Sequence, residues 1–362
     1  MNVMIVLGTR PEIIKMAPII RELRTRRRRF SLVHTGQHYS YEMDRTFFKS
    51  LGLPAATVNL NVGSGTHGAQ TAKILHRIEQ VLLELKPDVV LVEGDTNSVM
   101  AGALAAVKCH IPVGHVEAGL RSFDRRMPEE INRIVADHVA SFLYAPTPLA
   151  ARQLRKEGIA VGKILVTGNT VVDSLDWIKK NPALAATVRS LGFSPGRFLL
   201  TTIHREENVE DRRRLAGIVD GLHRVARHFD MPVVFPAHPR TKGRLNRWGL
   251  ENSLKLKNIR LLPPLDALPF MALQTHARLV LTDSGGVQEE SCILRVPCVT
   301  LRDNTERPET VAVGANLLAG ADPGKILAAS VRMSNRARSW KNPFGDGRSG
   351  RRIVDHLSSI FH

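Results

Sequence analysis

The chain has 362 residues, of which 43% are hydrophobic and 23% charged, as in a folded globular protein and not a disordered one. Its length is sufficient for two domains with cores of their own. The formal charge of +17 permits anionic partners. Neither a zinc-finger spacing nor a basic stripe interleaved with aromatic residues accompanies it, so nucleic acid is not an expected partner.

The three cysteines include no CxxC pair, which argues against a disulfide scaffold and fits a reducing cytosol, so we expect a cytoplasmic protein. The first residues, MNVMIVLGTRPE, lack a basic segment and a cleavage site, and we expect a strand there in place of a signal peptide. No apolar run reaches the roughly 20 residues of a membrane span, so a membrane partner is not expected.

Short apolar runs alternating with helical spacing predict an α/β protein with parallel sheets. In the first half we expect strands at residues 2–7, 31–35, 89–92, 111–116, 142–145 and 163–166. In the second half we expect them at residues 198–203, 233–235, 259–262, 279–282 and 296–300. This pattern predicts two doubly wound, Rossmann-like domains: residues 1–169 with a returning helix at 348–362, and residues 170–347. A ligand cleft is expected between them.

Acidic residues gather where the predicted strands at 89–92 and 111–116 end. Ligands of open α/β sheets bind beyond the carboxyl ends of the strands, and Asp95, His115 and Glu117 lie at or near that edge. A carboxylate cluster here indicates a site for proton transfer.

A helix predicted to begin at Pro128 adds Glu129 and Arg133, which are four residues apart and share a face. By itself this spacing is that of an ion pair worth about 0.2–0.5 kcal/mol. Following so closely after Asp95 and Glu117, the two residues indicate part of the same site, with Arg133 near an anion.

The first predicted strand also leads into a helix, with Pro11 suited to its first position. Arg10 at the start of this helix and Lys15 one turn inside would attract an anionic ligand, although a solvated basic face is equally compatible. No GxGxxG motif follows this strand, which argues against an NAD-dependent enzyme.

In the second half, Ser284, Gly285 and Gly286 follow the strand at 279–282 and open a helix. Free backbone N–H groups at a helix start favour a phosphate, and glycines let the backbone approach it closely. Glu290, a turn inside, could accept from ribose hydroxyls. An ordinary tight turn is the alternative, but the density of polar and glycine residues favours a phosphate site.

Four further residues are candidates with weaker signals. His204 follows the strand at 198–203, His238 and Arg307 add cationic side chains near other strand ends, and Phe270 could support a base. A histidine or phenylalanine at such a position is more often part of the packing. No His/Cys group has zinc spacing and no G-x-S-x-G elbow occurs, so neither a metal site nor a serine esterase is expected.

The chain resembles the non-hydrolysing UDP-N-acetylglucosamine 2-epimerase family over nearly its whole length. The matching segments, in the family order, are GTRPEIIKMAP, TGQHY, EGDTNS, HVEAGLRS, PEEINR, TGNT, TIHREEN, TDSGGVQEE and TERPE. The resemblance implies a glycosyltransferase-B-like pair of domains with the active site in their cleft. It also implies an isomerase that interconverts UDP-GlcNAc and UDP-ManNAc without NAD, and a homodimer.

By resemblance, Asp95, Glu117 and Glu129 correspond to the carboxylates implicated in the family's catalysis. The positions that correspond to nucleotide and phosphate contacts are Arg10, Lys15, His204, Ser284, Gly285, Gly286, Glu290 and Arg307. The family eliminates UDP to give 2-acetamidoglucal and then adds it back. We hypothesise that the three carboxylates share the proton transfers and that His204 assists the leaving group; which carboxylate faces which side of C2 stays open.

Two departures bear on substrate and regulation. The segments QHYSY and GTHG differ from bacterial members that a second UDP-GlcNAc activates, so such activation is not expected. The loop at residues 121–127 is similar to that of archaeal members and of UDP-2,3-diacetamido-2,3-dideoxyglucuronate 2-epimerases. Arg125 and Arg126 could meet a substrate uronate, which makes that sugar the alternative substrate. A glycosyltransferase is the alternative of another class.

Overall fold

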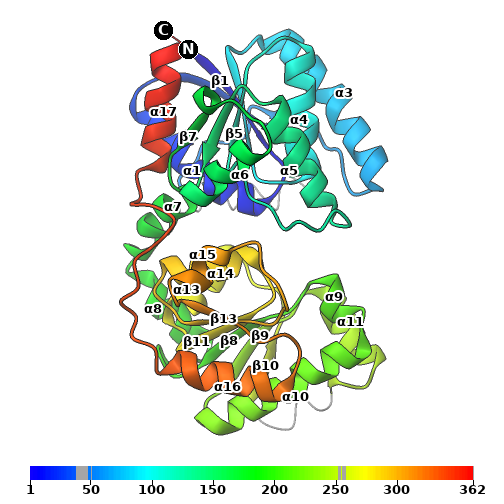
Figure 1. The fold of residues 1–362 in the computed structure, drawn as a ribbon, viewed down its shortest axis with the longest axis vertical. Coiled ribbons are helices and arrows are strands. Elements are labelled where there is room, and N and C mark those ends of the chain that lie inside the picture. Colours follow the sequence, from blue (N-terminus) through cyan, green and yellow to red (C-terminus); the bar gives the residue numbers. More distant parts are fainter. Residues whose placement is uncertain (38–47, 50, 252–253, 255–257, 362) are drawn as a thin grey trace. The chain divides into compact units, whose positions relative to one another are not determined.

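The computed structural model describes residues 1–37, 48–49, 51–251, 254 and 258–361. Residues 38–41 of the divergent QHYSY segment therefore lie outside the described residues. The contacts of the chain divide it into two compact units (Figure 1). Unit 1 is Met1–Asp176 with Phe344–His362, and unit 2 is Trp177–Pro343. The division falls inside helix α7 (Thr170–Lys179), a few residues after the predicted boundary at residue 169.

Unit 1 is built on a seven-stranded parallel sheet in the order β3-β2-β1-β4-β5-β6-β7. Its strands are β1 (Asn2–Leu7), β2 (Arg29–His34), β3 (Val58–Asn59), β4 (Val89–Glu93), β5 (Val113–Val116), β6 (Phe142–Ala145) and β7 (Ile164–Val166). Every side chain of the central strand β4 is buried, because helices cover both faces of such a sheet.

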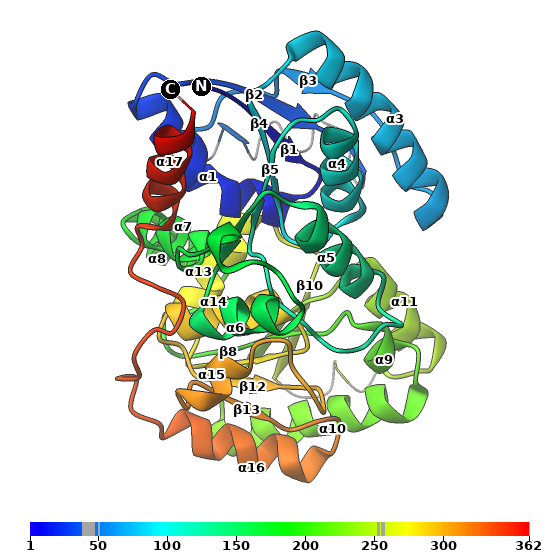
Figure 2. The same cartoon turned by 45° about the horizontal axis from the view of Figure 1, so that its top comes forward.

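The helices of unit 1 pack on both faces of this sheet. They are α1 (Arg10–Thr25), α3 (His67–Leu85), α4 (Asn97–Lys108), α5 (Pro128–Val139), α6 (Pro148–Lys156), the first part of α7, and α17 (Ser349–Ile360), with a 3-10 turn at Val161–Lys163. The helices α3, α4 and α5 pack in a row, and α1 packs against α17 on the other side, as both ribbon views show (Figure 2).

The last helix, α17, reaches α1 because a glycine permits it. A Cβ on Gly350 would collide with the ring and backbone of Pro18, so only a residue without a side chain allows this approach. Farther along, Arg26 pairs with Asp355 at 2.6 Å. These contacts place the C-terminal segment in unit 1.

Unit 2 contains a six-stranded parallel sheet in the order β10-β9-β8-β11-β12-β13. Its strands are β8 (Leu199–Thr202), β9 (Val233–Pro236), β10 (Ile259–Leu262), β11 (Leu279–Thr282), β12 (Cys298–Thr300) and β13 (Asn316–Leu318). The helices are α8 (Ala183–Ser190), α9 (Glu206–Val209), α10 (Arg212–Phe229), α11 (Pro239–Arg247), α13 (Ala267–His276), α14 (Gly285–Ile293), α15 (Pro308–Ala312) and α16 (Pro323–Ser334). A separate hydrophobic core lies between this sheet and its helices.

The prediction of two doubly wound α/β halves is confirmed. Every predicted strand is present, with ends shifted by at most two residues. The short edge strands β3 and β13 were not predicted, since neither contains an apolar run long enough to be recognised. Among the described residues, no helix is long and apolar enough to cross a membrane.

Candidate functional site

The carboxyl edge of the unit 1 sheet brings together the acidic residues predicted from the sequence. Strands β4 and β5 pair directly, with Glu93 opposite Val116. Asp95 follows β4, and Glu117 follows β5. Glu117 has a φ of 68°, a left-handed conformation that is unfavourable for a residue with a side chain.

Lys15 on α1 lies between two of these carboxylates. Its Nζ is 2.5 Å from Oε2 of Glu117 and 3.1 Å from Oε1 of Glu93. The same Glu117 oxygen accepts from Nδ2 of Asn169 at 3.0 Å. Burial raises the pKa of Glu93 well above its usual range, and Glu117 contributes to the rise, although Lys15 opposes it. The predicted anion-binding lysine thus holds the side chain of Glu117 in place.

Arg133 on α5 has the same relation to Asp95. Its Nη2 lies 2.5 Å from Oδ2 of Asp95, and its Nη1 lies 2.7 Å from Oε2 of Glu130. Glu130 is buried and also accepts from the backbone N–H groups of Ser122 (2.9 Å) and Phe123 (3.0 Å). Glu130 therefore ties the loop before α5 to the arginine that holds Asp95.

The Glu129 carboxylate takes no part in these pairs. It is partly exposed, and within the described part of the chain it has no hydrogen-bond partner. The ion pairs that Arg133 makes run to Asp95 and to Glu130, three residues earlier, in place of the Glu129 pair that the spacing suggested.

Glu12, in the first turn of α1, was not predicted as part of the site. It is buried and accepts from the N–H groups of Gly8 and Thr9 and from the hydroxyl of Thr96. Burial raises the pKa of Glu12 to about 7 against the effect of these donors, and nearby Asp95 adds to the rise. Glu12 thus connects the start of α1 to the loop that carries Asp95.

His115, which was predicted near this edge, is fully buried beneath it. Its Nδ1 lies 2.7 Å from Oδ1 of Asp137, and its Nε2 lies 2.8 Å from the carbonyl oxygen of Gly94. Asp137 also pairs with Arg121 at 2.7 Å. His115 is therefore a buried neighbour of the site that lies below its surface.

In unit 2, a cavity of about 200 Å³ opens at the carboxyl ends of β8 and β9. Four residues that the sequence marked separately line it together: His204, His238, Phe270 and Ser284. The remaining lining is mostly apolar: Thr202, Ile203, Pro236, Pro264, Leu265 and Val287. A small, largely apolar cavity with a few polar groups is the usual form of a ligand site.

A buried carboxylate fixes the orientation of His204. Asp283, at the end of β11, lies 3.0 Å from Nδ1 of His204 and accepts from the N–H groups of His204 and Arg205 and from Asn208. Burial acts to raise the pKa of Asp283, but these donors outweigh it and the pKa is lowered. With Nδ1 held by Asp283, the other ring nitrogen, Nε2, is left for a ligand.

The two glycines at the start of α14 have different reasons to lack a side chain. Ser284 caps the helix, accepting from the backbone N–H of Val287. A Cβ on Gly285 would collide with the carboxylate of Glu306, whereas one on Gly286 would meet nothing closer than the Ser284 hydroxyl at 4.0 Å. Gly285 thus makes room for a protein group, and Gly286 leaves the helix start open.

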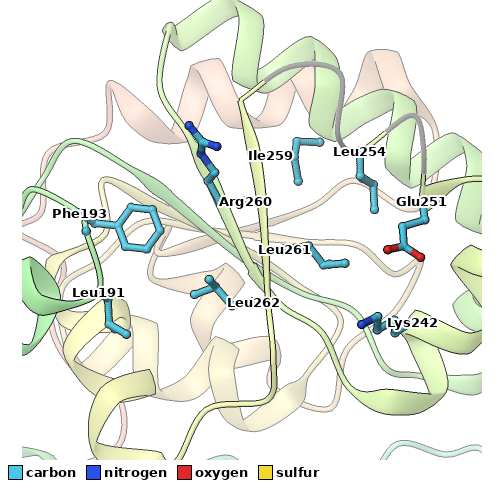
Figure 3. A pocket seen from close by; sticks show the side chains of 10 residues that line it. Leu191, Phe193, Lys242, Glu251, Leu254, Ile259, Arg260, Leu261 and Leu262 are labelled. Carbon is cyan, nitrogen blue, oxygen red and sulfur yellow. The ribbon is translucent and has the colours of Figure 1, made fainter.

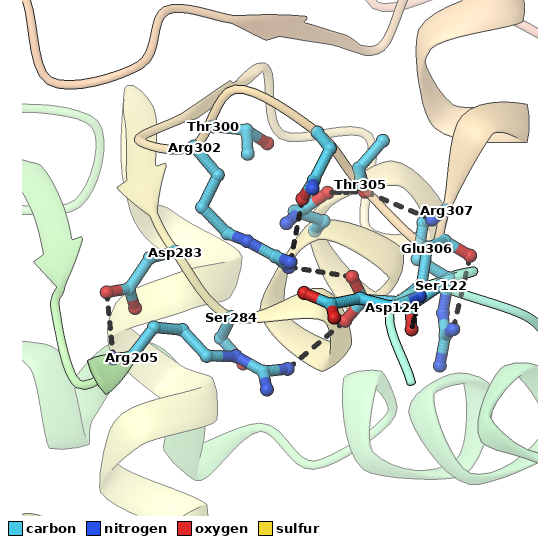
Figure 4. Close-up of polar contacts among 12 residues, drawn as sticks. Ser122, Asp124, Arg205, Asp283, Ser284, Thr300, Arg302, Thr305, Glu306 and Arg307 are labelled. Carbon is cyan, nitrogen blue, oxygen red and sulfur yellow. Dashed lines mark hydrogen bonds and ion pairs between the residues drawn. The ribbon is translucent and has the colours of Figure 1, made fainter. Parts of the chain in front are cut away.

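Arginine–glutamate pairs, most of them buried, lie close to that helix start. Arg205 and Arg302 converge on Glu306 at 3.1 and 2.7 Å (Figure 4). The predicted phosphate contact Arg307 is buried and pairs with Glu289 at 3.1 Å. These pairs hold the positive charges close to α14.

The remaining predicted residues are partly exposed. Arg10 is the first residue of α1, and Glu290 lies in the second turn of α14.

A larger cavity in unit 2, of about 640 Å³, lies beside the edge strand β10 (Figure 3). It is lined by Leu191, Gly192, Phe193, Lys242, Glu251, Leu254 and all of β10, so none of the predicted site residues is in its described lining.

Sequence reasoning missed five acidic residues that organise the site: Glu12, Glu93, Glu130, Asp137 and Asp283. Three of them carry a recognisable signal, because Glu93 and Asp283 each directly follow a predicted strand and Glu12 stands in the first turn of a predicted helix. For Glu130 and Asp137 the sequence offers none, since each acts through partners several residues away.

These features define a two-unit α/β protein in which a group of carboxylates lies at the edge of one parallel sheet and a small cavity lies at the edge of the other. The family model described as UDP-N-acetylglucosamine 2-epimerase matches residues 21–358, and the chain belongs to that family.

Three proteins illustrate the similarity. The UDP-N-acetylglucosamine 2-epimerase of Methanocaldococcus jannaschii is 54% identical over 99% of each chain. A crystal structure of the M. jannaschii UDP-GlcNAc 2-epimerase in complex with UDP-GlcNAc and UDP superimposes with a TM-score of 0.91, covering 99% of this chain and 100% of that chain at 54% identity. A UDP-2,3-diacetamido-2,3-dideoxy-D-glucuronate 2-epimerase of Pseudomonas aeruginosa is 40% identical, covering 99% of this chain and 100% of that protein.

Proposed function

We propose that this protein interconverts UDP-N-acetylglucosamine and UDP-N-acetylmannosamine by inverting C2. The observation that carries the proposal is the pair of carboxylates Asp95 and Glu117 at the ends of adjacent strands, each held by a cation from a neighbouring helix. The 54% identity to the M. jannaschii epimerase over the whole chain supports the same substrate.

Removal of the C2 proton needs a path that avoids a free carbanion, because C2 of the sugar is not next to a carbonyl. We propose that the C1–O bond breaks as a base takes the C2 proton, so that the electron pair forms the C1=C2 bond. UDP departs with the electrons of the C1–O bond. Addition of UDP back to C1, with a proton delivered to the other face of C2, completes the epimerisation.

The residues would divide this work between the two units. Asp95, Glu117 and Glu129 of unit 1 would exchange the protons, as positioned carboxylates do. In unit 2, His204 and the helix start at Ser284–Gly286 would stabilise the diphosphate, since free N–H groups and the helix dipole favour an anion. The uracil ring of UDP would lie against the apolar side of the cavity, at Phe270.

The alternative uronate substrate has weaker support from the loop before α5. Arg126 is held by Asp124, with both Nε and Nη2 at 2.8 Å from the two carboxylate oxygens. The hydrogen bonds from Arg126 hold the pKa of Asp124 at about 2, so the carboxylate stays charged and paired. Both arginines are exposed, as residues on a solvated loop are, and UDP-GlcNAc is the better-supported substrate.

Incubation in D₂O without added NAD tests the proposal. UDP-GlcNAc should gain deuterium at C2 and UDP-ManNAc should appear, both followed by NMR. UDP-2,3-diacetamido-2,3-dideoxyglucuronate is run in parallel and should react more slowly. The proposal is wrong if neither sugar exchanges its C2 hydrogen for deuterium. Transfer of the sugar to an added acceptor without exchange at C2 would instead indicate a glycosyltransferase.

The cytoplasmic location and the homodimer stay predictions.

A further inference from the structure

His115 fixes the peptide that carries Asp95. Its Nε2 lies 2.8 Å from the carbonyl oxygen of Gly94, and that carbonyl belongs to the peptide joining Gly94 to Asp95. Gly94 has a φ of 85°, a conformation open to glycine in which the chain leaves the regular strand. The contact with the imidazole therefore fixes the orientation of the peptide group that precedes Asp95.

Asp137 extends this contact to two more segments. Its Oδ1 lies 2.7 Å from Nδ1 of His115, and its Oδ2 accepts from the N–H of Gly119 at 3.1 Å. Gly119 stands two residues after Glu117, and Asp137 belongs to α5, the helix on which Glu129 lies. Together with the contact to the end of β4, the pair reaches all three segments that carry the proposed proton-transfer groups.

Both nitrogens of the buried ring face oxygen acceptors. A neutral imidazole has one N–H and one lone pair, so one of the two contacts would set a lone pair against an oxygen. Only the imidazolium donates to Asp137 and to Gly94 at once. An arrangement with an acceptor on each side therefore indicates a charged ring.

The charged groups around the ring support this state. Burial acts to lower the pKa of His115 and Arg121 acts in the same direction, but the charge and hydrogen bond of Asp137, with the Gly94 carbonyl, outweigh them and the pKa is raised. Asp137 faces the ring from α5 and Arg121 from the loop after β5. Arg121 also pairs with the partly exposed Glu157 at 2.6 Å, so Asp137 and Glu157 together supply two anions to balance Arg121 and a charged His115.

We infer that His115 is a positioning residue: a buried imidazolium that, through Asp137 and Gly94, holds the segments of Asp95, Glu117 and Glu129 in register. The inference rests on the proposed function, in which these carboxylates transfer the protons. His115 itself stays beneath the site and touches no substrate. Because its pKa is raised, its stabilising contribution is present at low pH and is lost as the pH rises through the folded-state value.

The protonation state of the ring is tested by NMR on the whole protein labelled with 15N-histidine. The His115 signals are assigned by their loss in His115→Gln, or by their shift in Asp137→Asn. At about pH 7, where an ordinary histidine with a pKa of about 6.5 has mostly lost one proton, both ring nitrogens should still carry a proton. A ring with a single N–H at about pH 7 would overturn the inference.

The positioning role is tested by kinetics. In His115→Gln, the kcat for epimerisation should fall about 100-fold, as expected when reacting groups are misplaced by about 1 Å. The KM should change less than about threefold, since the change acts on the transition state. Tyr144→Phe is the matched control. Tyr144 lies on β6, the strand beside β5, and the change removes a hydroxyl that lies 3.1 Å from Nδ1 of His356 on α17. The kcat of this variant should match that of the wild type.

The outcomes separate this inference from the proposed function. If the wild-type protein shows no exchange at C2, the proposed function fails whatever the ring state. The positioning role is wrong if the wild type is active and His115→Gln has the wild-type kcat. It is also wrong if the variant differs from the wild type only by a higher KM. Should His115→Gln fail to fold, the kcat of Asp137→Asn and the wild-type ring signals decide.

Discussion

Single residues of this protein carry charge states that depend on burial. Glu12 is the clearest example, because it is buried at the start of α1 and all of its contacts come from donors. Burial raises its pKa from 4.5 to about 7. The folded state therefore binds a proton at Glu12 more tightly than the unfolded chain does. As the pH rises from about 4.5 to about 7, Glu12 loses this proton and its contribution lowers the free energy of unfolding of the protein.

Glu12→Gln should remove this pH dependence. The amide oxygen can accept from Gly8 and Thr9, and the amide nitrogen can donate to Thr96, so the contacts survive without the charge. At about pH 8 the variant should be more stable than the wild type by up to about 3 kcal/mol, with little difference at about pH 5. Urea unfolding at the two pH values measures this, and a variant less stable at both would contradict it.

At the scale of elements, α5 carries two adjacent glutamates in different environments. Glu130 points inward, where it accepts from Ser122 and Phe123 and pairs with Arg133, whereas Glu129 is partly exposed. The φ of 60° at Phe123 shows that the loop before α5 is held in an unfavourable conformation. The structure thus assigns the loop's stability to Glu130 and leaves Glu129 available for chemistry.

Substitution of the two neighbours should separate stability from activity. Glu130→Ala should cost about 1–3 kcal/mol of stability, since it leaves two loop N–H groups without an acceptor and removes one carboxylate from Arg133, which still pairs with Asp95. Glu129→Gln should leave the urea midpoint unchanged while kcat for epimerisation falls about 100-fold or more. Equal effects of the two variants on both measurements would show that this division is wrong.

At the scale of the whole molecule, each unit has its own sheet and its own core. The described residues that line the 200 Å³ cavity all belong to unit 2, and Asp95, Glu117 and Glu129 belong to unit 1. Nucleotide binding and proton transfer are therefore expected to reside in different units.

The fragment 177–343 tests this separation, because unit 2 is continuous in the chain. Expressed alone, it should fold and bind UDP, which calorimetry would detect, yet catalyse no exchange at C2. His204→Ala in the same fragment should weaken UDP binding about tenfold, in proportion to one lost charged hydrogen bond. A folded fragment without UDP binding would place the nucleotide contacts outside unit 2.

Several site residues could be predicted from the sequence because their signals are local. Asp95 and Glu117 follow strong strand patterns, so their place at the sheet edge follows from the parallel fold. Ser284 and Gly286 stand at a strand-to-helix turn. The role of Glu130 could not be predicted, because its partners Ser122 and Phe123 come from a loop whose path no periodic pattern describes.

The sequence by itself determined the two parallel α/β halves and the family, since hydrophobic periodicity and strand-end motifs are short-range features. Only the tertiary structure decided which charges pair: that Arg133 holds Asp95 and Glu130, that Asp283 orients His204, and that His115 lies between two acceptors. Pairing and protonation depend on burial and on distances between segments far apart in the chain, because the energy of a charge is set by the groups that replace its water.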